Sequence, residues 1–430
     1  MNFLRFAVAA ALAAAIPTNA LAQTLNHAEQ QLLVERLEAV LNDNYVFPDR
    51  VPTIALELEK LPSAKGIDAK SFAENLSKAL VAASDDLHFF VGYDPDAVAS
   101  LRRAKAEGHA STAEQREMER AANYGFRDAR RLDGDIAYIR FDFFAEPQYA
   151  QEIAAGAMRF AAGSKALIID LRYNNGGTLE MAQLLMSYLY PADKEQKFFQ
   201  YYYNENGSRI ERGQWNLAAV PGPRLPDIPV VILTGSTSFS AAEWMAYSLQ
   251  KLGRATVIGK QTAGGAHPVS RVPIDAGFLL QVPIGQIHGP VDDQDFEGAG
   301  VTPDIAVPSS QALLTAQRVL LEKLASQGDK AARWALVPVE FALSGKASDA
   351  RTQDEAAGRY EGRKLLRTTD GLTYLWRERF TLALEPVGSD LFAVEGTDDY
   401  RVRLVRTNGK VSGLERVWSS GAIQTYKRLD

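Results

Sequence analysis

Short apolar runs alternate with helix-patterned segments through the middle of the chain, and this alternation restricts the possible folds more than any other feature. The runs at 166–169, 229–233 and 255–258 contain no charged residue. Such runs are typical of strands that are buried on both faces of a parallel sheet. Because helix-patterned segments separate them, the sequence predicts an α/β core with a largely parallel sheet over residues 125–310.

The segments on either side of this core follow other patterns. Before it, apolar residues recur at helical spacing, and a charged, alanine-rich stretch then leads into the core. After it, one more helical pattern is followed by short apolar runs separated by turn signals, of which Asn408-Gly409 is the strongest. We therefore expect an N-terminal helical domain, a helical connector, the α/β core, a helical extension and a small C-terminal antiparallel β domain, over residues 23–95, 96–124, 125–310, 311–345 and 356–430.

The first 22 residues have the pattern of a signal peptide. Arg5 gives a positive start, residues 6–16 are apolar, and Ala20-Leu21-Ala22 is a suitable cleavage site. This apolar stretch is too short to span a bilayer, and no later stretch approaches the necessary length. The sequence therefore predicts a protein that is periplasmic or secreted after cleavage near Ala22, with no membrane span.

Charge and cysteine content exclude several classes of function. The formal net charge is −6, and the 47 lysine and arginine residues are scattered along the chain, which argues against a nucleic-acid partner. The chain contains no cysteine, so disulfide bonds and cysteine-ligated zinc are excluded. Stability must come from packed cores.

The stretch 234–250 contains several serines, of which Ser240 has two possible roles. Glu243 stands three residues later, which is the spacing of a capping box at a helix start. Alternatively, Ser240 is a nucleophile beyond the carboxyl end of a strand, where α/β sheets gather their reactive groups. The surrounding residues do not form the G-x-S-x-G elbow of α/β-hydrolases. This stretch alone leaves both roles open.

A second stretch, 170–177, follows another predicted strand and ends in Gly176 and Gly177. Adjacent glycines at a helix entrance let backbone N–H groups approach a ligand closely and stabilise negative charge, as an oxyanion hole requires. A tight strand-to-helix turn would need the same glycines. The residues alone do not decide between the two interpretations.

Four motifs in a fixed order resemble the tail-specific (C-terminal processing) serine peptidase family. They are ALIIDLRYNNGGT, LTGSTSFSAAEWMAYSL, RATVIGKQTAGGAHP and FEGAGVTPDIAVP. In detail the motifs are similar to the branch of interphotoreceptor retinoid-binding protein and, more distantly, the tricorn core peptidase. The resemblance covers about residues 26–308 and implies a ClpP/crotonase-like core.

The resemblance implies a role for each residue that matches a motif. Ser240 matches the nucleophile, and His88, in a D-x-H segment before the core, matches the base of the tricorn-like branch. Glu297, shortly before a GV-x-PD motif, matches the acid that orients this histidine. The oxyanion hole would consist of backbone N–H groups from Gly176 or Gly177 together with Ala241.

The chain departs from the processing-peptidase branch at its base. That branch uses a lysine about twenty-five residues after the nucleophile, where this chain has two glycines, so the resemblance argues against a serine–lysine dyad. His267 is the rival of His88 as base, because the family often has a histidine in this loop. The expected residues of the substrate pocket are His267, Asn174, Gly264 and Gly265.

Taken together, these matches imply an exported serine peptidase that acts on a peptide or protein substrate and needs no metal or organic cofactor. Processing peptidases usually insert a PDZ module before the core, but too few residues lie between His88 and the strand near Asp135 for one. The alternative is a protein that kept the fold, lost catalysis and binds an apolar ligand or a peptide, as retinoid-binding relatives do.

Overall fold

The structure, a computed structural model, divides into two compact units. It describes residues 24–61, 66–86, 88–107, 112–205, 208–275, 277–291, 293–346, 350–376 and 379–430. Unit 1 comprises the residues up to Thr112 together with Tyr203–Ile210 and Val269–Gly285, and unit 2 comprises the rest. The expected signal peptide lies outside the described residues.

Unit 1 has a helical N-terminal region, as predicted. Its helices are α1 (His27–Asn44), α2 (Val51–Leu58), α3 (Ala69–Ser84) and α4 (Pro95–Ala106), and its short paired strands are β1 (Thr24–Leu25) and β2 (Ile67–Asp68). A three-stranded antiparallel sheet has the order β11 (Val269–Pro273), β12 (Phe278–Pro283) and β3 (Phe90–Tyr93). Leucines at helical spacing, such as Leu33, Leu37 and Leu41 of α1, pack with this sheet in one core.

Unit 2 contains a six-stranded sheet in which the strands follow one another in chain order. The strands are β4 (Phe126–Leu132), β5 (Ile136–Phe141), β6 (Ala166–Asp170), β9 (Val230–Thr234), β10 (Ala255–Gly259) and β14 (Ile305–Ala306). All neighbours are parallel except β4, which pairs antiparallel with β5 at the edge. The predicted α/β core with a largely parallel sheet is therefore present.

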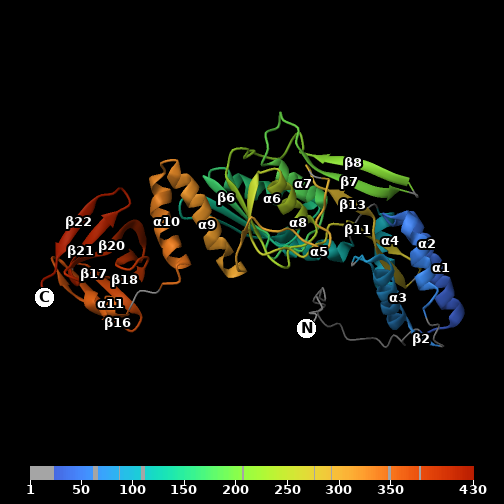
Figure 1. The fold of residues 1–430 in the computed structure, drawn as a ribbon, viewed down its shortest axis with the longest axis horizontal. Coiled ribbons are helices and arrows are strands. Elements are labelled where there is room, and N and C mark those ends of the chain that lie inside the picture. Colours follow the sequence, from blue (N-terminus) through green and yellow to red (C-terminus); the bar gives the residue numbers. More distant parts are fainter. Residues whose placement is uncertain are drawn as a thin grey trace. The chain divides into compact units, whose positions relative to one another are not determined.

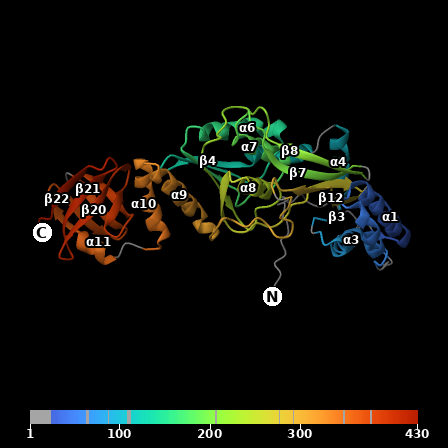
Figure 2. The same cartoon turned by 45° about the horizontal axis from the view of Figure 1, so that its top comes forward.

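Helices cover both faces of this sheet, which explains why its strands are apolar throughout. The helices are α6 (Pro147–Ala161), α7 (Leu179–Ser187) and α8 (Ala241–Lys251) on one face, and α9 (Ser309–Ser326) and α10 (Lys330–Leu343) on the other. Successive residues of β6 point to opposite faces, so Leu167 packs with the first group and Ile168 with the second. In Figures 1 and 2, α9 and α10 lie between the sheet and the C-terminal strands.

Between β6 and β9, and again after β12, the chain forms strands that were not predicted from the sequence. The region between the strands β6 and β9 and a later segment supply a small sheet in the order β13 (Gly285–His288), β7 (Lys197–Glu205) and β8 (Ser208–Trp215). These strands mix aromatic and polar residues and have no continuous apolar run. The connector forms α4 and a second helix, α5 (Ala113–Ala121), which belong to different units.

The C-terminal strands form an eight-stranded antiparallel sheet in which each strand pairs with the next. They are β15 (Gly358–Tyr360), β16 (Arg363–Thr368), β17 (Gly371–Trp376), β18 (Phe380–Pro386), β19 (Leu391–Val394), β20 (Thr397–Thr407), β21 (Lys410–Trp418) and β22 (Ile423–Lys427). Backbone hydrogen bonds also join the first strand to the last, from Leu429 N to Arg359 O (2.8 Å) and from Glu361 N to Lys427 O (3.1 Å). The sheet thus closes on itself almost as a barrel and surrounds its own apolar core.

A short helix, α11 (Ala350–Ala356), precedes the first strand of this C-terminal module and packs with it. Ala356 lies in the core of the module, and its carbonyl accepts a hydrogen bond from Tyr360 Oη at 2.7 Å. The Arg401 guanidinium, on the outer face of β20, stacks 3.9 Å from the ring centre of Trp334 in α10. Arg401 Nη2 also donates to Trp334 O at 2.7 Å, and Trp334 Nε1 donates to Asp398 O at 3.0 Å. The module therefore has its own core and contacts α10 through a cation–π interaction and two hydrogen bonds.

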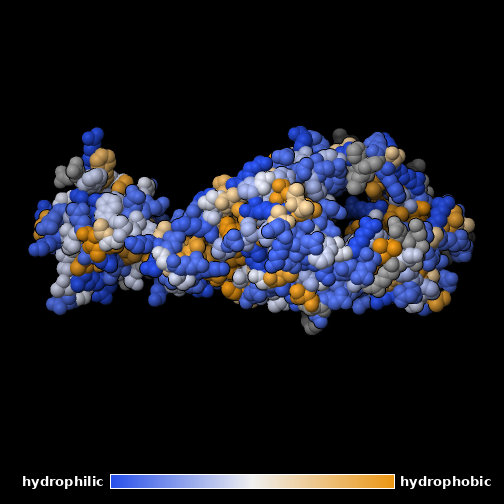
Figure 3. Space-filling model, turned by 90° about the horizontal axis from the view of Figure 1, so that it is seen from above, coloured by the Kyte–Doolittle hydropathy of each residue, from blue (hydrophilic) through white to orange (hydrophobic). Residues whose placement is uncertain are grey.

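The described part of the chain contains no helix that is long and apolar enough to cross a membrane. On the face drawn in Figure 3, hydrophobic side chains form small groups separated by hydrophilic ones.

We expect that a truncation after Ser344, which removes α11 and the whole barrel, leaves a cooperatively folding protein. The module's core is separate, so the loss should be about 2 kcal/mol, the usual size of a desolvated cation–π contact such as that of the buried Arg401 on Trp334. Urea unfolding followed by circular dichroism measures this difference. A matched truncation after Val394 leaves an open half-barrel and should aggregate. A non-cooperative transition in the first variant would show that the module is part of the core.

Candidate active site

Two loops meet at the carboxyl edge of the sheet in unit 2. Strands β6 and β9 are parallel neighbours, with Asp170 opposite Leu233, so the loops that follow them start side by side. The loops are joined by hydrogen bonds from Phe239 N to Asn174 O (3.1 Å) and from Thr237 Oγ1 to Arg172 O (2.9 Å). The stretches 170–177 and 234–250 therefore form one local structure at this edge of the sheet.

The two serines nearest to α8 have different surroundings. Ser238 is completely buried, and its hydroxyl donates to Leu171 O (2.6 Å) and accepts from Gly235 N (2.9 Å). Ser240 is partly exposed and immediately precedes α8, with φ 54° and ψ −121°. A positive φ is costly for serine and is found mainly where the surrounding structure enforces it, often at functional sites. Ser238 holds the turn, whereas Ser240 remains accessible.

The turn at Gly176 and Gly177 packs directly against Ser240. Gly176 has φ +93°, and a Cβ atom there would lie 2.7 Å from Ser240 Cβ. Gly177 has φ +134°, and a Cβ atom there would lie 2.1 Å from Phe144 O. Only glycine fits either position, because both the backbone conformation and the space exclude a side chain.

The N–H groups around Ser240 differ in availability. Gly176 N donates to Asn174 Oδ1 at 2.8 Å, so this donor is already used. Within the described ranges of the chain, no acceptor is bonded to the N–H of Gly177 or of Ala241. These two groups, from the glycine turn and from the start of α8, are the donors that could bind an oxyanion.

Asn174 was expected to line the substrate pocket, and the structure gives it another position. Its side chain is fully buried, and its Nδ2 donates to Phe141 O at 2.9 Å while its Oδ1 accepts from Gly176 N. Both ends of the amide are thus used inside the protein. Asn174 fixes the glycine turn.

Glu243 does more than cap α8. Its completely buried carboxylate accepts hydrogen bonds from Ser240 N (2.8 Å), Thr262 Oγ1 (2.5 Å), Gly264 N (2.7 Å) and Gly265 N (2.8 Å). Burial raises the pKa of this carboxyl, while the four donors act in the opposite direction. One carboxylate therefore fixes both the backbone of Ser240 and the loop that follows β10. This loop uses Gly264 and Gly265 as donors to Glu243, so their N–H groups point away from a pocket.

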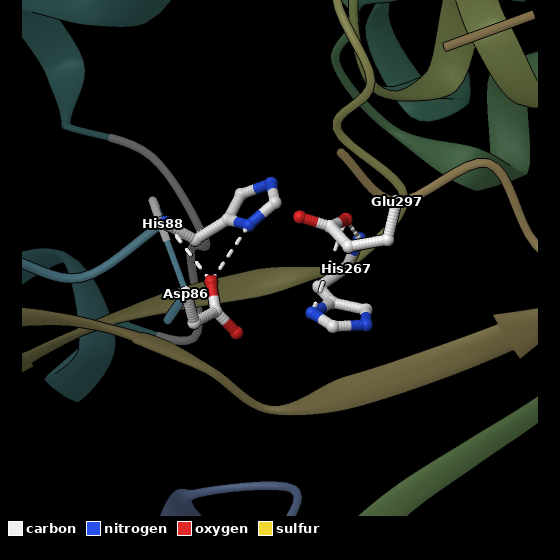
Figure 4. Close-up of side chains that lie close together, drawn as sticks. All are labelled: Asp86, His88, His267 and Glu297. Carbon is white, nitrogen blue, oxygen red and sulfur yellow. Dashed lines mark hydrogen bonds and ion pairs between the residues drawn. The ribbon is translucent and has the colours of Figure 1, made fainter. Parts of the chain in front are cut away.

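Glu297 fixes the next part of the same loop. Its Oε2 accepts from Ala266 N at 2.7 Å and from His267 N at 3.2 Å, and it lies 3.9 Å from His267 Nδ1. Figure 4 shows this pair, both members of which belong to unit 2. Glu297 and His267 are thus neighbours, and the carboxylate orients the backbone of the histidine.

His88 forms an acid–histidine pair of its own within unit 1. Asp86 Oδ1 lies 3.0 Å from His88 Nδ1 and also accepts from His88 N at 2.9 Å, as Figure 4 shows. Both side chains are buried, and His88 O accepts from Gln281 Nε2 of β12 at 3.0 Å. A carboxylate on one ring nitrogen fixes the orientation of the imidazole. The family motif implies this role for Glu297, and Asp86 was not among the predicted site residues, although its D-x-H spacing to His88 is visible in the sequence.

Asp170 and Arg172 brace the end of β6. Arg172 forms a bidentate ion pair with Asp170, in which Nη2 and Oδ2 lie 2.6 Å apart, and its Nη1 donates to Ser309 O. The second partner of Asp170 is Tyr138 Oη at 2.6 Å, and burial together with this contact raises the pKa of the phenol. The pair is fully engaged in holding the strand end.

Two family matches cover most of the described chain before the C-terminal module. Residues 135–307 match the family described as "Peptidase family S41", and residues 11–124 match "N-terminal domain of Peptidase_S41 in eukaryotic IRBP".

The curated relatives are processing proteases. The chain is 27% identical over 182 residues to the carboxy-terminal-processing protease of Bartonella bacilliformis. The aligned region covers 41% of this chain and 40% of the relative. The chain is also 27% identical over 177 residues to the carboxyl-terminal-processing protease of a Picosynechococcus species, and this alignment covers 40% and 39%. The chain thus spans about two fifths of the length of these relatives. Among solved structures, a lipoprotein from Streptococcus agalactiae aligns over 68% of this chain and 96% of its own, with 16% identity and a TM-score of 0.49.

We expect Glu243→Gln to lower the free energy of unfolding by at least about 2 kcal/mol, because the amide keeps the volume but turns one acceptor toward donors as an NH₂ group. Urea unfolding measures the change. Glu180→Gln, at an exposed position in the first turn of α7, is the matched control and should stay within about 0.5 kcal/mol. Equal effects of the two substitutions would contradict the role given to Glu243.

Proposed function

Because the chain carries a peptidase family S41 domain and an N-terminal domain of the kind that accompanies it, we propose that it is an exported serine peptidase. It hydrolyses peptide bonds through an acyl-enzyme on Ser240. The observation that carries the proposal is the local structure around Ser240: a partly exposed serine on a strained turn, against which the glycine turn packs, with N–H groups at Gly177 and Ala241 in the adjoining backbone that are unbonded within the described chain.

In the proposed reaction, Ser240 Oγ attacks the carbonyl carbon of the substrate and its proton passes to a histidine. The negative charge that develops on the carbonyl oxygen is stabilised by the N–H groups of Gly177 and Ala241. The protonated histidine then gives its proton to the leaving amine, and the acyl-enzyme forms. Water, activated by the same histidine, releases the acyl group and restores Ser240.

We assign the base to His88, on the strength of its D-x-H segment and of its pairing with Asp86. The assignment requires that His88 of unit 1 come within hydrogen-bond reach of Ser240 during the reaction. Asp86 would keep the imidazole in one orientation and stabilise its charged form, as the acid of a catalytic triad does. Glu297, the acid expected from the family motif, is proposed to support the site by fixing the loop at Ala266 and His267.

The finer features of the proposal come from the family resemblance. They are a ClpP/crotonase-like core, export through the N-terminal signal sequence with cleavage near Ala22, and a peptide or protein substrate. The proposed reaction uses the chain's own side chains and backbone, with no metal or organic cofactor in any step.

Ser240→Ala is expected to abolish hydrolysis and labelling by a fluorophosphonate, which reacts with activated serines, while the melting temperature changes by no more than the loss of a cap of about 1 kcal/mol implies. A peptide-library digest and a labelling gel measure the two activities. Ser236→Ala, which removes an exposed hydroxyl in the same loop, is the matched control and should remain fully active. Wild-type chain that neither cleaves peptides nor takes the label would favour the alternative function, binding of an apolar ligand or peptide without catalysis.

His88→Ala is expected to lower kcat by about a thousandfold, because a general base contributes 10²–10⁴-fold, while His267→Ala should mainly raise KM. Steady-state kinetics on a peptide found in the library digest distinguish the two effects. Asp86→Asn and Glu297→Gln then identify the orienting acid, since the substitution with the larger fall in kcat removes it. The reverse ranking of the histidines would make His267 the base.

A further inference from the structure

One end of the C-terminal barrel carries a group of arginine and aromatic side chains that the proposed reaction does not use. Because the strands alternate in direction, the end of each odd-numbered strand and the start of each even-numbered strand meet at this end of the barrel. Inward-facing residues near this end include Arg363 and Arg416 together with Tyr400, Trp376 and Trp418. Tyr426, in the last part of β22, contacts Arg363.

The register of the strands shows that both arginines face the inside of the barrel. Arg363 lies opposite Tyr360, and Arg416 lies opposite Val402. Tyr360 and Val402 are buried in the core of the barrel, and directly opposed residues share one face of a sheet. Burial raises the pKa of the Tyr374 phenol to about 12, and the positive charges of Arg363 and Arg416 lower this pKa in part. The register thus directs both positive charges toward the inside of the barrel.

These arginines lack the carboxylate partners that other arginines of the module have. Arginines with a carboxylate oxygen within 4.0 Å are Arg351, Arg359, Arg367, Arg403, Arg406 and Arg428. For Arg363 and Arg416, the described part of the chain supplies no such carboxylate, and the Nε atom of each is buried without a hydrogen-bond partner. A guanidinium group that is partly removed from water without an anion is costly, so an anion bound there would lower the free energy of the folded protein.

Aromatic rings surround both guanidinium groups. The Arg416 guanidinium lies 3.8 Å from the ring centre of Tyr400 and 4.5 Å from that of Trp418. The Arg363 guanidinium lies 4.7 Å from the ring centre of Tyr426 and donates to its hydroxyl at 3.1 Å. Arg363 Nη1 also donates to Gly362 O at 2.7 Å, so part of its donor capacity is used. These stacking contacts orient both guanidinium groups and leave the remaining in-plane N–H groups, those of Arg416 above all, for another acceptor. The same rings offer apolar surface beside the charges.

We propose that this end of the barrel binds an organic anion, namely a carboxylate attached to an apolar or aromatic group. Arg363 and Arg416 bind the carboxylate, and the rings of Trp376, Trp418 and Tyr400 contact the apolar part. The binding is independent of the chemistry at Ser240. Two sources supply such a ligand, the C-terminus of a peptide and a fatty acid, and both present the same chemistry to the site.

The test is calorimetric titration of the full-length Ser240→Ala chain with matched probes. N-acetyl-phenylalanine and its amide differ only in the charge of the carboxyl group, so the acid should bind at least tenfold more tightly. Decanoate represents the fatty-acid source: tighter binding of decanoate than of N-acetyl-phenylalanine supports the site with that source, and the opposite order supports it with a peptide C-terminus. Equal affinity for the acid and the amide would overturn the proposal.

Substitutions then locate the bound carboxylate. Arg363→Gln and Arg416→Gln should each weaken binding of N-acetyl-phenylalanine at least tenfold. Arg403→Gln, which removes an outward-facing arginine of the same barrel, should leave the affinity unchanged. Wild-type affinity in both inward-facing variants would place the ligand elsewhere and overturn the proposal. If a glutamine variant does not fold, the comparison of acid and amide on the Ser240→Ala chain still decides whether an anion is recognised.

Discussion

The buried carboxylate of Glu243 is the interaction on which the candidate active site of unit 2 depends. It binds the backbone of the nucleophile's turn and the backbone of the loop after β10 with the same two oxygens. A single buried charge with four donors is stable only in one arrangement, because any displacement leaves it without a partner in a dry environment. The carboxylate therefore forces Ser240 and the loop leading to His267 to keep one mutual position.

The glycine turn completes this arrangement from the other side. Gly176 lies so close to Ser240, and Gly177 so close to Phe144, that neither could carry a side chain. Asn174 fixes the turn through hydrogen bonds at both ends of its amide. Strain at Ser240 is a cost that such a rigid frame can sustain. The frame is assembled before any substrate arrives, which is the condition for backbone N–H groups to stabilise a developing charge without rearranging.

Structural roles that depend on a local sequence pattern could be predicted, whereas roles that depend on contacts between distant segments could not. The strands β6, β9 and β10 were predicted because burial on both faces leaves an apolar run, and the capping position of Glu243 followed from its spacing to Ser240. The further hydrogen bonds of Glu243, to Gly264 N and Gly265 N, join residues 21 and 22 positions apart, and no local sequence pattern predicts them. The burial of Asn174 could not be predicted, because the sequence does not show whether a polar side chain near a glycine turn faces the interior or the solvent. The helix at 350–356 was overlooked because its polar residues show no apolar period.

The strand that follows His88 has a consequence for the order in which the molecule can be made. Strand β3 pairs with β12, and the contact of Gln281 with the His88 carbonyl joins residues 193 positions apart. A chain that emerges from its N-terminus, whether from a ribosome or from a secretion channel, cannot give β3 its neighbour until about two thirds of the polypeptide is present. Closing so long a loop is also slow, since its entropy is lost before the pairing is gained. The His88 segment can therefore reach its final structure only once β12 has emerged, and a shorter partial chain lacks this structure.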